Sequence, residues 1–320
     1  MTDSSFALRV QHLAKTYAIG FFRKKVRAAV DVTLEVTCGE IFALLGPNGA
    51  GKTTTLKVLM GLIRPSAGSV ELLGRPVGDL HAKRRLGYLP ENPYFYDYLT
   101  GRELLVFMGK LFGLDRGESQ RRAAALLDQV GLAGAADLAL RRYSKGMLQR
   151  VGLAQALIND PELVILDEPL TGLDPLGRKD VRELIADLRK RGKTVLFSSH
   201  ILPDVELLAD RVTILVRGRT VATGPLDQLL DARLISTEVV MGRPTETLLG
   251  ELAAAGHMVV RSGDTAQVTV QGEVSVDPVV DLIRKHGCSV LGVSPRKESL
   301  EDVVVRQARA GDARSEGTDA

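Results

Sequence analysis

The chain has 320 residues, 45% of them hydrophobic and 25% charged, with a net charge of +3; these values indicate a globular protein, with two domains favoured by the length, and argue against a nucleic-acid binder. No stretch approaches the ~18 apolar residues of a membrane span, and the first ten residues lack the basic and apolar parts of a secretory signal. The two cysteines lie far apart without metal-binding spacing, which is typical of reduced thiols in a cytosolic protein.

Residues 7–38 alternate apolar and polar side chains with a period of two. This pattern predicts strands of a half-exposed antiparallel layer. The segment between its two halves, GFFRKKVRA, is aromatic and basic. It can contact lipid or a partner, but a solvated hairpin is the simpler interpretation.

Three continuous apolar runs stand further along the chain, IFALL at 41–45, LVIL at 163–166 and TVLF at 194–197. Unbroken runs of this length are typical of strands in a mostly parallel sheet that is covered on both faces. Each run is followed by a loop and a helix-like segment. The alternation predicts an α/β fold.

The first of these runs leads into a glycine-rich loop that opens a helical pattern. Its glycines permit backbone angles that a Cβ would penalise, so that successive N–H groups can surround an anion. We expect Lys52 to bridge the outer phosphates of a nucleoside triphosphate, the Thr53 hydroxyl to hold Mg²⁺, and Thr54 to bond a phosphate oxygen. The alternative is a glycine-rich turn that contains a lysine by chance. It would not explain the apolar run before the loop and the helical pattern after it. The predicted binding residues are Gly46, Pro47, Asn48, Gly49, Ala50, Gly51, Lys52, Thr53 and Thr54.

From Thr100 to about residue 157, apolar residues recur at intervals of three and four, which predicts an inserted helical subdomain. Thr100 and Glu103 have the spacing of a capping box. Near the far end, Ser144 can cap a helix whose positive end starts at Gly146. A second phosphate-facing helix end is redundant in one chain, but it makes sense opposite a nucleotide held by another chain.

Asp167 and Glu168 directly follow the apolar run at 163–166. At this end of a buried strand, Asp167 is expected to bind Mg²⁺, and Glu168 to act as the general base on the attacking water. Such an acid pair can also cap the next helix. Pro169 and the upstream phosphate loop favour the catalytic interpretation.

The pattern of apolar and polar residues changes near residue 231. Residues 231–306 suggest the element order β-α-β-β-α-β-α, and their two halves resemble each other. The first six elements form the split β-α-β pattern of a ferredoxin-like α+β domain. Residues 307–320 lack large apolar side chains and are predicted to be a disordered tail.

The segment RRYSKGMLQRVGLAQAL resembles the signature motif of ATP-binding cassette (ABC) ATPases, whose usual form is Leu-Ser-Gly-Gly-Gln. Ser144 and Gly146 keep the pattern, whereas Tyr143, Lys145 and Met147 depart from it. The resemblance implies a P-loop ABC ATPase domain at 6–230, with a mixed sheet core, an antiparallel β layer and an inserted helical subdomain.

Other family motifs then fall in order. By resemblance, Tyr17 stacks on adenine; a core tyrosine is the less favoured alternative. Asp174 in LTGLD is the key acid of the loop that couples two sites, and His200 in SSHIL contacts the γ-phosphate. Glu91 stands where the family normally has glutamine. A carboxylate there can still reach Mg²⁺ but cannot donate like an amide.

The motifs YLPEN, YSKGM and SLEDV are similar to one branch of the family, ATPase subunits of exporters whose membrane permease is a separate chain. The resemblance implies ATP hydrolysis with Mg²⁺ and either a head-to-tail homodimer or a paired ABC subunit. It also implies a peripheral place on the cytoplasmic face, with membrane contact only through the permease and no nucleic-acid partner. The aromatic segment NPYFYDY can form the docking surface or belong to the core.

Three other functions remain open from the sequence. A soluble ABC ATPase acting on ribosomes or DNA is disfavoured because there is one cassette and no coiled-coil insertion. An importer subunit is the alternative within transport. An interaction module with a dead site is disfavoured by the intact Lys52, Asp167, Glu168 and His200.

Overall fold

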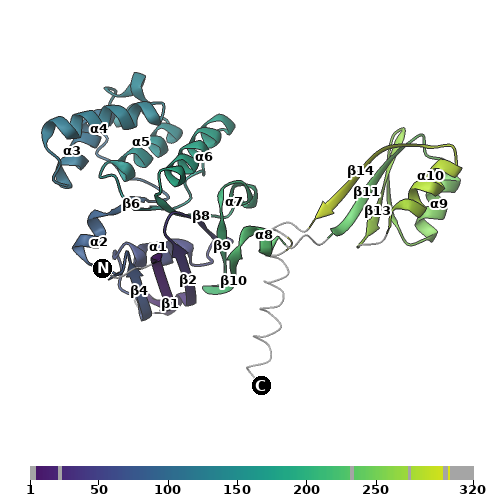
Figure 1. The fold of residues 1–320 in the computed structure, drawn as a ribbon, viewed down its shortest axis with the longest axis horizontal. Coiled ribbons are helices and arrows are strands. Elements are labelled where there is room, and N and C mark those ends of the chain that lie inside the picture. Colours follow the sequence, from purple (N-terminus) through teal and green to yellow (C-terminus); the bar gives the residue numbers. More distant parts are fainter. Residues whose placement is uncertain (1–4, 21–23, 231–233, 273–274, 298–301, 303–320) are drawn as a thin grey trace. The chain divides into compact units, whose positions relative to one another are not determined.

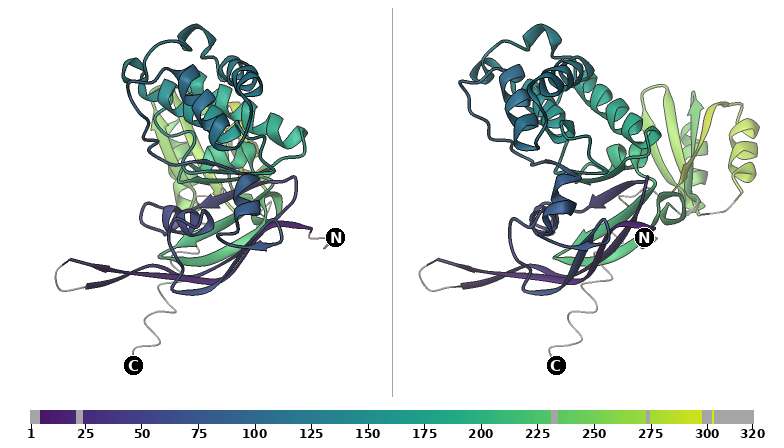
Figure 2. Two further views of the ribbon diagram at one scale, coloured as in Figure 1. Left: turned by 90° about the vertical axis from the view of Figure 1, so that its left-hand side faces the viewer. Right: turned by 60° about the vertical axis from the view of Figure 1, so that its left-hand side comes forward.

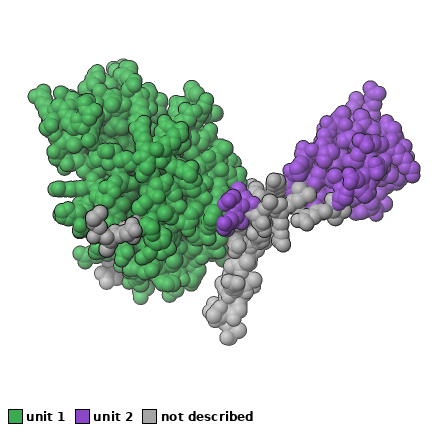
Figure 3. All heavy atoms as spheres, viewed as in Figure 1, with its two compact units in different colours: residues 1–226, 307–320 green, residues 227–306 purple. Residues whose placement is uncertain are grey.

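The computed structural model describes residues 5–20, 24–230, 234–272, 275–297 and 302. They fall into two compact units, the first extending to Leu226 and the second from Asp227 to Arg306 (Figure 3). No helix among these described residues is both long and apolar enough to cross a bilayer. The tail expected at 307–320 lies outside them, and so do residues 298–306, where the last helix of the predicted order would fall, except Asp302.

Five parallel strands form one end of the ten-stranded sheet in the first unit. They lie in the order β9-β3-β8-β7-β6, and every residue of β3, β7 and β8 is buried. The three apolar runs are therefore confirmed as covered parallel strands. The third extends to Ser199, beyond its apolar part. The bounds are β3 Ile41–Leu45, β6 Leu86–Leu89, β7 Leu163–Leu166, β8 Thr194–Ser199 and β9 Arg211–Val216.

An antiparallel layer continues the same sheet, as the period-two pattern predicted. Strands β1 and β2 run side by side as a long hairpin (Figure 2). Strand β10 pairs with β9 and meets β2 at one residue pair, Arg219 with Asp31. Residues 24–27 of the aromatic and basic segment lie in β2 and are exposed. The bounds are β1 Phe6–Ile19, β2 Lys24–Thr37, β4 Ala67–Leu72, β5 Arg75–Pro76 and β10 Arg219–Pro225.

The helices of this unit follow the strands as the α/β pattern predicts. Helix α1 directly follows the phosphate loop, and α3, α4 and α5 group together near β6 (Figure 1). The bounds are α1 Lys52–Leu59, α2 Leu80–Arg84, α3 Gly101–Leu111, α4 Arg116–Gln129, α5 Lys145–Leu157, α6 Pro175–Lys190 and α7 Leu202–Leu208, with 3₁₀ turns at Ala133–Ala135 and Leu140–Arg142. The short helix α8, Leu226–Leu229, spans the boundary between the two units.

The predicted capping box at the start of α3 is present. Thr100 Oγ1 accepts a hydrogen bond from the Glu103 N–H at 3.1 Å, and Glu103 Oε2 accepts one from the Thr100 N–H at 2.9 Å. These bonds satisfy two backbone donors that a helix start leaves without partners, which typically stabilises a helix by ~1 kcal/mol. The helix therefore begins where the sequence indicates.

The second unit contains the six elements of the predicted ferredoxin-like pattern. Its four strands are antiparallel in the order β12-β13-β11-β14, and α9 and α10 pack on one face (Figure 1). Leu248 and Leu252 of α9 and Ile283 of α10 meet the buried valines of the sheet in a separate core. The bounds are β11 Leu234–Gly242, α9 Glu246–Ala254, β12 Met258–Ser262, β13 Thr265–Gln271, α10 Asp277–Lys285 and β14 Ser289–Lys297.

Candidate active site

The loop between β3 and α1 has a backbone that requires glycine. Gly51 has φ +102°, and a Cβ there would stand 2.5 Å from the Ala28 carbonyl oxygen. A Cβ on Gly46 would stand 2.4 Å from the carbonyl oxygen of Leu215. Both distances are shorter than any carbon–oxygen contact allows. The loop is therefore held tightly against neighbouring strands while its N–H groups and the start of α1 remain available to an anion.

A cleft of about 520 Å³ lies over this loop. It brings together residues from the loop, from the segment after β6, and from the ends of β7 and β8. The predicted residues Glu91, Glu168 and His200 are all among them. The lining consists of Ala28, Pro47, Asn48, Gly49, Ala50, Gly51, Lys52, Thr53, Thr54, Glu91, Glu168, Thr171 and His200.

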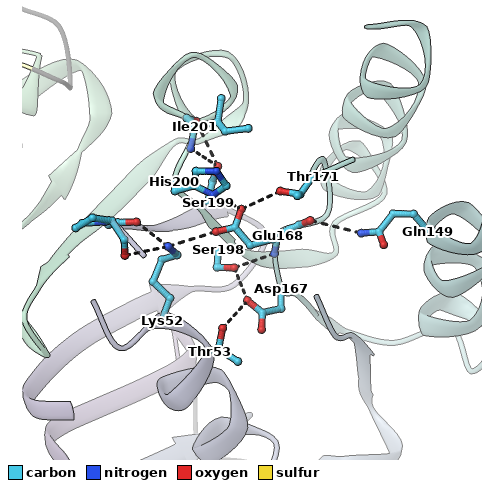
Figure 4. Close-up of polar contacts among 12 residues, drawn as sticks. Lys52, Thr53, Gln149, Asp167, Glu168, Thr171, Ser198, Ser199, His200 and Ile201 are labelled. Atoms are coloured by element: carbon cyan, nitrogen blue, oxygen red, sulfur yellow. Dashed lines mark hydrogen bonds and ion pairs between the residues drawn. The ribbon is translucent and has the colours of Figure 1, made fainter. Parts of the chain in front are cut away.

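Lys52 and Glu168 form the charged centre of the cleft (Figure 4). Both are 6% exposed, and Lys52 Nζ lies 3.3 Å from Glu168 Oε1. Lys52 Nζ also donates to the Gly46 carbonyl at 2.6 Å and to the Pro47 carbonyl at 3.4 Å. The ammonium group is thus turned back over the phosphate loop, where it can meet an anion bound there.

The Glu168 carboxylate is contacted on its other side by two side chains, His200 and Thr171. Its Oε2 lies 2.9 Å from His200 Nδ1 and accepts a hydrogen bond from Thr171 Oγ1 at 3.2 Å. The Glu168 backbone is in the left-handed region with φ +51°, which non-glycine residues rarely adopt. This conformation turns the side chain from the end of β7 into the cleft.

Asp167 is fully buried and points below Glu168. Its Oδ1 accepts a hydrogen bond from Ser198 Oγ at 2.6 Å, and Thr53 Oγ1 lies 3.5 Å away. Its Oδ2 is buried and has no hydrogen-bond partner in the described part of the chain. Burial raises the pKa of Asp167, and the charges of Glu91 and Glu168 add to the rise, while Ser198 and Thr53 oppose it.

These groups offer a divalent cation an incomplete set of oxygen ligands. Within the described residues, no cluster of three or more His, Cys, Asp or Glu side chains holds a metal by itself. Mg²⁺ typically binds through one or two carboxylates and substrate phosphates, not through an all-protein cage. The free Oδ2 of Asp167, with Thr53 and Glu91 in the same region, therefore fits Mg²⁺.

Six predicted residues are not among the described residues that line the cleft: Tyr17, Gly46, Ser144, Gly146, Asp167 and Asp174. Gly46 and Asp167 directly adjoin the lining residues Pro47 and Glu168 in the chain, and the other four do not adjoin the lining. Tyr17 lies on β1, and Lys15 Nζ stands 5.2 Å from the centre of its ring. Ser144 caps α5, its Oγ accepting from the Met147 N–H at 3.2 Å, and Asp174 caps α6 through the Gly177 N–H at 2.9 Å.

The segment that resembles the signature motif and the LTGLD loop lie side by side in the folded chain. A Cβ on Gly146 would stand 3.4 Å from Leu173 Cδ2, and one on Gly172 would stand 2.7 Å from Lys145 Cε. Helix α5 begins at Lys145, one residue before the predicted Gly146. The replacement of the usual leucine by Tyr143 serves packing, because Tyr143 is buried and its hydroxyl donates to the Ala135 carbonyl at 2.8 Å.

Sequence reasoning missed three residues that hold the acidic pair. Ser198 and Thr171 contact the two carboxylates, and Gln149 of α5 donates to backbone carbonyls of the same loop. Ser198 could have been found from its place at the end of β8, beside β7 in a parallel sheet. Gln149 and Arg150 continue the segment that resembles the signature motif as expected, but that resemblance does not indicate the contact of Gln149 with this loop.

Comparison with known proteins agrees with this geometry. A family model described as ABC transporter matches residues 29–171. An uncharacterized ABC transporter ATP-binding protein of Synechocystis is 48% identical over 300 residues, covering 93% of this chain and 83% of that protein. The Nod factor export ATP-binding protein I of Burkholderia lata is 37% identical over 278 residues, covering 86% of this chain and 90% of its own.

Solved structures give the same result. The structure of an ATP-binding subunit of an ABC transporter has a TM-score of 0.63 at 36% identity, covering 70% of this chain and 91% of its own. A dimeric, post-hydrolysis ATP-binding cassette with ADP and Pi has a TM-score of 0.64 at 25% identity, covering 68% of this chain and 98% of that chain. The fold, the cleft and these relatives together place the chain in the ABC transporter family, as an ATP-binding subunit with ATPase activity.

Proposed function

We propose that this subunit drives export through a separate membrane permease by binding and hydrolysing ATP at the cleft. The observation that carries the proposal is the convergence of the phosphate loop, Glu168 and His200 on one cleft. Relatives named for Nod factor export support the direction. In this proposal residues 6–230 are the ATPase domain, with the helical subdomain at about 100–157, and residues 231–306 are an accessory domain. The subunit acts at the cytoplasmic face and touches the membrane only through the permease.

In the proposed site, the loop from Gly46 to Thr54 surrounds the phosphates and Tyr17 stacks on adenine. Lys52 leaves Glu168 for the outer phosphates, since a bound phosphate offers its ammonium group a stronger partner than one carboxylate oxygen. Glu168 then accepts a proton from the attacking water, and His200 holds the Glu168 carboxylate and the γ-phosphate. Mg²⁺ would lie between Asp167, Thr53 and Glu91 and neutralise charge on the phosphates.

The second half of the site is proposed to come from another cassette, either a second copy or a paired ABC subunit. Ser144 and Gly146 begin α5 and do not line the cleft of their own chain in the described structure. The N-terminus of α5 suits an anion, because its N–H groups and dipole are positive there. Asp174 would shape the interface, since the LTGLD loop packs beside the same helix start. A relative that forms a dimer supports this arrangement.

The role of Glu91 in holding the metal has a direct test. Replacing Glu91 with glutamine removes one negative charge beside the cation, so that half-maximal ATPase activity should need about three- to tenfold more Mg²⁺. The measurement is phosphate release against Mg²⁺ concentration at saturating ATP. The matched control is Glu71→Gln, since Glu71 is exposed on β4 and is not among the described residues of the cleft. An unchanged Mg²⁺ requirement in Glu91→Gln would remove Glu91 from the metal site.

The proposed permease contact is a second hollow of about 820 Å³ beside the helical subdomain. Tyr94 in its wall is fully exposed, while Phe95 is half-buried and lies near Gly152 of α5. Exposed aromatic rings are costly in water and are enriched at protein interfaces. The hollow is lined by Pro93, Tyr94, Phe95, Tyr96, Asp97, Tyr98, Met108, Leu140, Arg141, Tyr143 and Leu148.

Replacing Tyr94 and Phe95 with alanine should therefore uncouple transport. Co-purification with the permease, and transport by the pair, should fall at least about tenfold, because aromatic hot spots at interfaces carry about 2 kcal/mol or more each. Basal ATPase of the isolated subunit should stay within about twofold. The control is Phe112→Ala, an exposed aromatic at the end of α3 that is not among the described lining residues. Unchanged permease binding and transport would contradict the proposed docking surface.

A further inference from the structure

Gln149 connects helix α5 to the loop that carries the acidic pair. Its side chain is 5% exposed and lies among the buried residues of α5. Its Nε2 donates to the Pro169 carbonyl at 3.1 Å and lies 3.5 Å from the Glu168 carbonyl (Figure 4). A buried amide with both contacts on one loop helps to fix the path of that loop, since its loss would remove the donor to the Pro169 carbonyl and one of two donors to the Glu168 carbonyl.

Gln149 contacts the backbone at Glu168, which has an unusual conformation. Glu168 has φ +51°, and such a conformation persists only where its surroundings hold it. Its N–H donates to Ser198 Oγ at 2.9 Å, and its carbonyl accepts from the Thr171 N–H at 3.2 Å. Ser198 holds one side of the peptide from β8, while Gln149 holds the carbonyl side from a different element, α5. The direction of the Glu168 carboxylate depends on both.

We propose that Gln149 is a positioning residue for ATP hydrolysis, which holds the left-handed backbone at Glu168 and thereby aims its carboxylate at the attacking water. The inference rests on the proposed role of Glu168 as general base. Gln149 lies about one and a half helical turns after Ser144 on the same helix. The helix that presents Ser144 to a partner's nucleotide therefore also holds the catalytic loop of its own chain. A movement of α5 would therefore shift the Glu168 backbone and its carboxylate through the contacts of the Gln149 amide.

The test uses two variants that keep the size of the side chain. Gln149→Met removes the donor, and Gln149→Glu replaces it with an acceptor that faces two carbonyl oxygens. Both should lower kcat about 10- to 100-fold, since a displacement near 1 Å at a reacting group costs about that much. The KM for ATP and the number of ATP molecules bound per chain should stay within about twofold. The matched control, Gln155→Met on the same helix, should keep kcat, because Gln155 makes no side-chain hydrogen bond within the described structure.

The readouts separate positioning from damage to the fold. A merely structural role would lower ATP-binding stoichiometry and activity together, leaving kcat per bound ATP unchanged, and this result would overturn the inference. Full kcat in both Gln149 variants would overturn it as well. Glu168→Gln, measured beside them, shows which proposal fails. If Glu168→Gln loses turnover while the Gln149 variants keep it, the positioning role is wrong; if Glu168→Gln itself keeps turnover, the proposed base is wrong.

Discussion

Replacing Glu168 with glutamine is expected to lower ATPase turnover by about 10²- to 10⁴-fold while ATP binding stays close to normal. The amide has nearly the shape of the carboxylate and can still accept from His200 and Thr171, which lie 2.9 and 3.2 Å from Glu168 Oε2. It cannot accept a proton from water. Because glutamine tolerates φ +51° no worse than glutamate does, the loop should keep its path.

The measurement is single-turnover phosphate release, together with equilibrium binding of ATP to the same preparation. Glu183→Gln is the control, since Glu183 lies on α6 and pairs only at the surface with Lys179, at 3.8 Å with both side chains about two-thirds exposed. Such pairs contribute ~0–1 kcal/mol, and the control should hydrolyse ATP as the unmodified chain does. Near-normal turnover in Glu168→Gln would mean that another group activates the water.

The sequence predicted the strands and the phosphate loop because both depend on local patterns. Unbroken apolar runs indicate buried strands, and the loop glycines meet a steric demand that is visible at Gly46 and Gly51. The capping box at Thr100 is equally local, because its partners lie three residues apart. The strands and the capping box follow from a known periodicity or from contacts within the segment. The loop was recognised from the spacing of its glycines, although Gly46 and Gly51 contact other strands.

The contacts that orient Asp167 and Glu168 depend on the pairing register of neighbouring strands. This register cannot be derived from the sequence pattern. Strands β7 and β8 pair in parallel with Leu166 opposite Phe197, so the next residue of each strand brings Asp167 beside Ser198. A shift of one residue would place Phe197 there instead and leave the carboxylate without its donor. Gln149 depends on how α5 packs against the loop, a tertiary contact with no sequence spacing of its own.

A second reason is shown by the predicted residues that neither line nor adjoin the cleft, Tyr17, Ser144, Gly146 and Asp174. Ser144 and Asp174 cap helix starts through contacts that are complete within one chain, and Gly146 is the second residue of α5. A site shared between two cassettes gives each chain only part of its residues. The motif therefore predicted the position of Ser144 on the fold, whereas the role of Ser144 depends on a second chain.

The Glu168→Gln protein should form a dimer in saturating ATP and Mg²⁺ and dissociate when nucleotide is removed. Nucleotide that cannot be hydrolysed keeps its γ-phosphate, and the phosphate of one cassette is then held by Lys52 of that chain and the α5 start of the other. Light scattering after gel filtration should give about twice 34.6 kDa with ATP and 34.6 kDa without it. If the protein stays at 34.6 kDa in ATP and Mg²⁺, with and without its permease, the shared site is wrong.

A second substitution separates the phosphate contact from helix stability. Asp caps helices as well as Ser does, and this chain already uses Asp115 and Asp174 as caps, so Ser144→Asp should leave α5 intact. Its charge would face the γ-phosphate, and like charges about 4 Å apart repel by ~4 kcal/mol at an effective dielectric of 20, close to 10³-fold in affinity. Ser144→Asp added to Glu168→Gln should therefore abolish the dimer at micromolar protein. Thr245→Asp, at the cap of α9 in the second unit, carries the same charge and should leave the dimer intact; equal dimer formation by both variants would show that α5 does not face the phosphate.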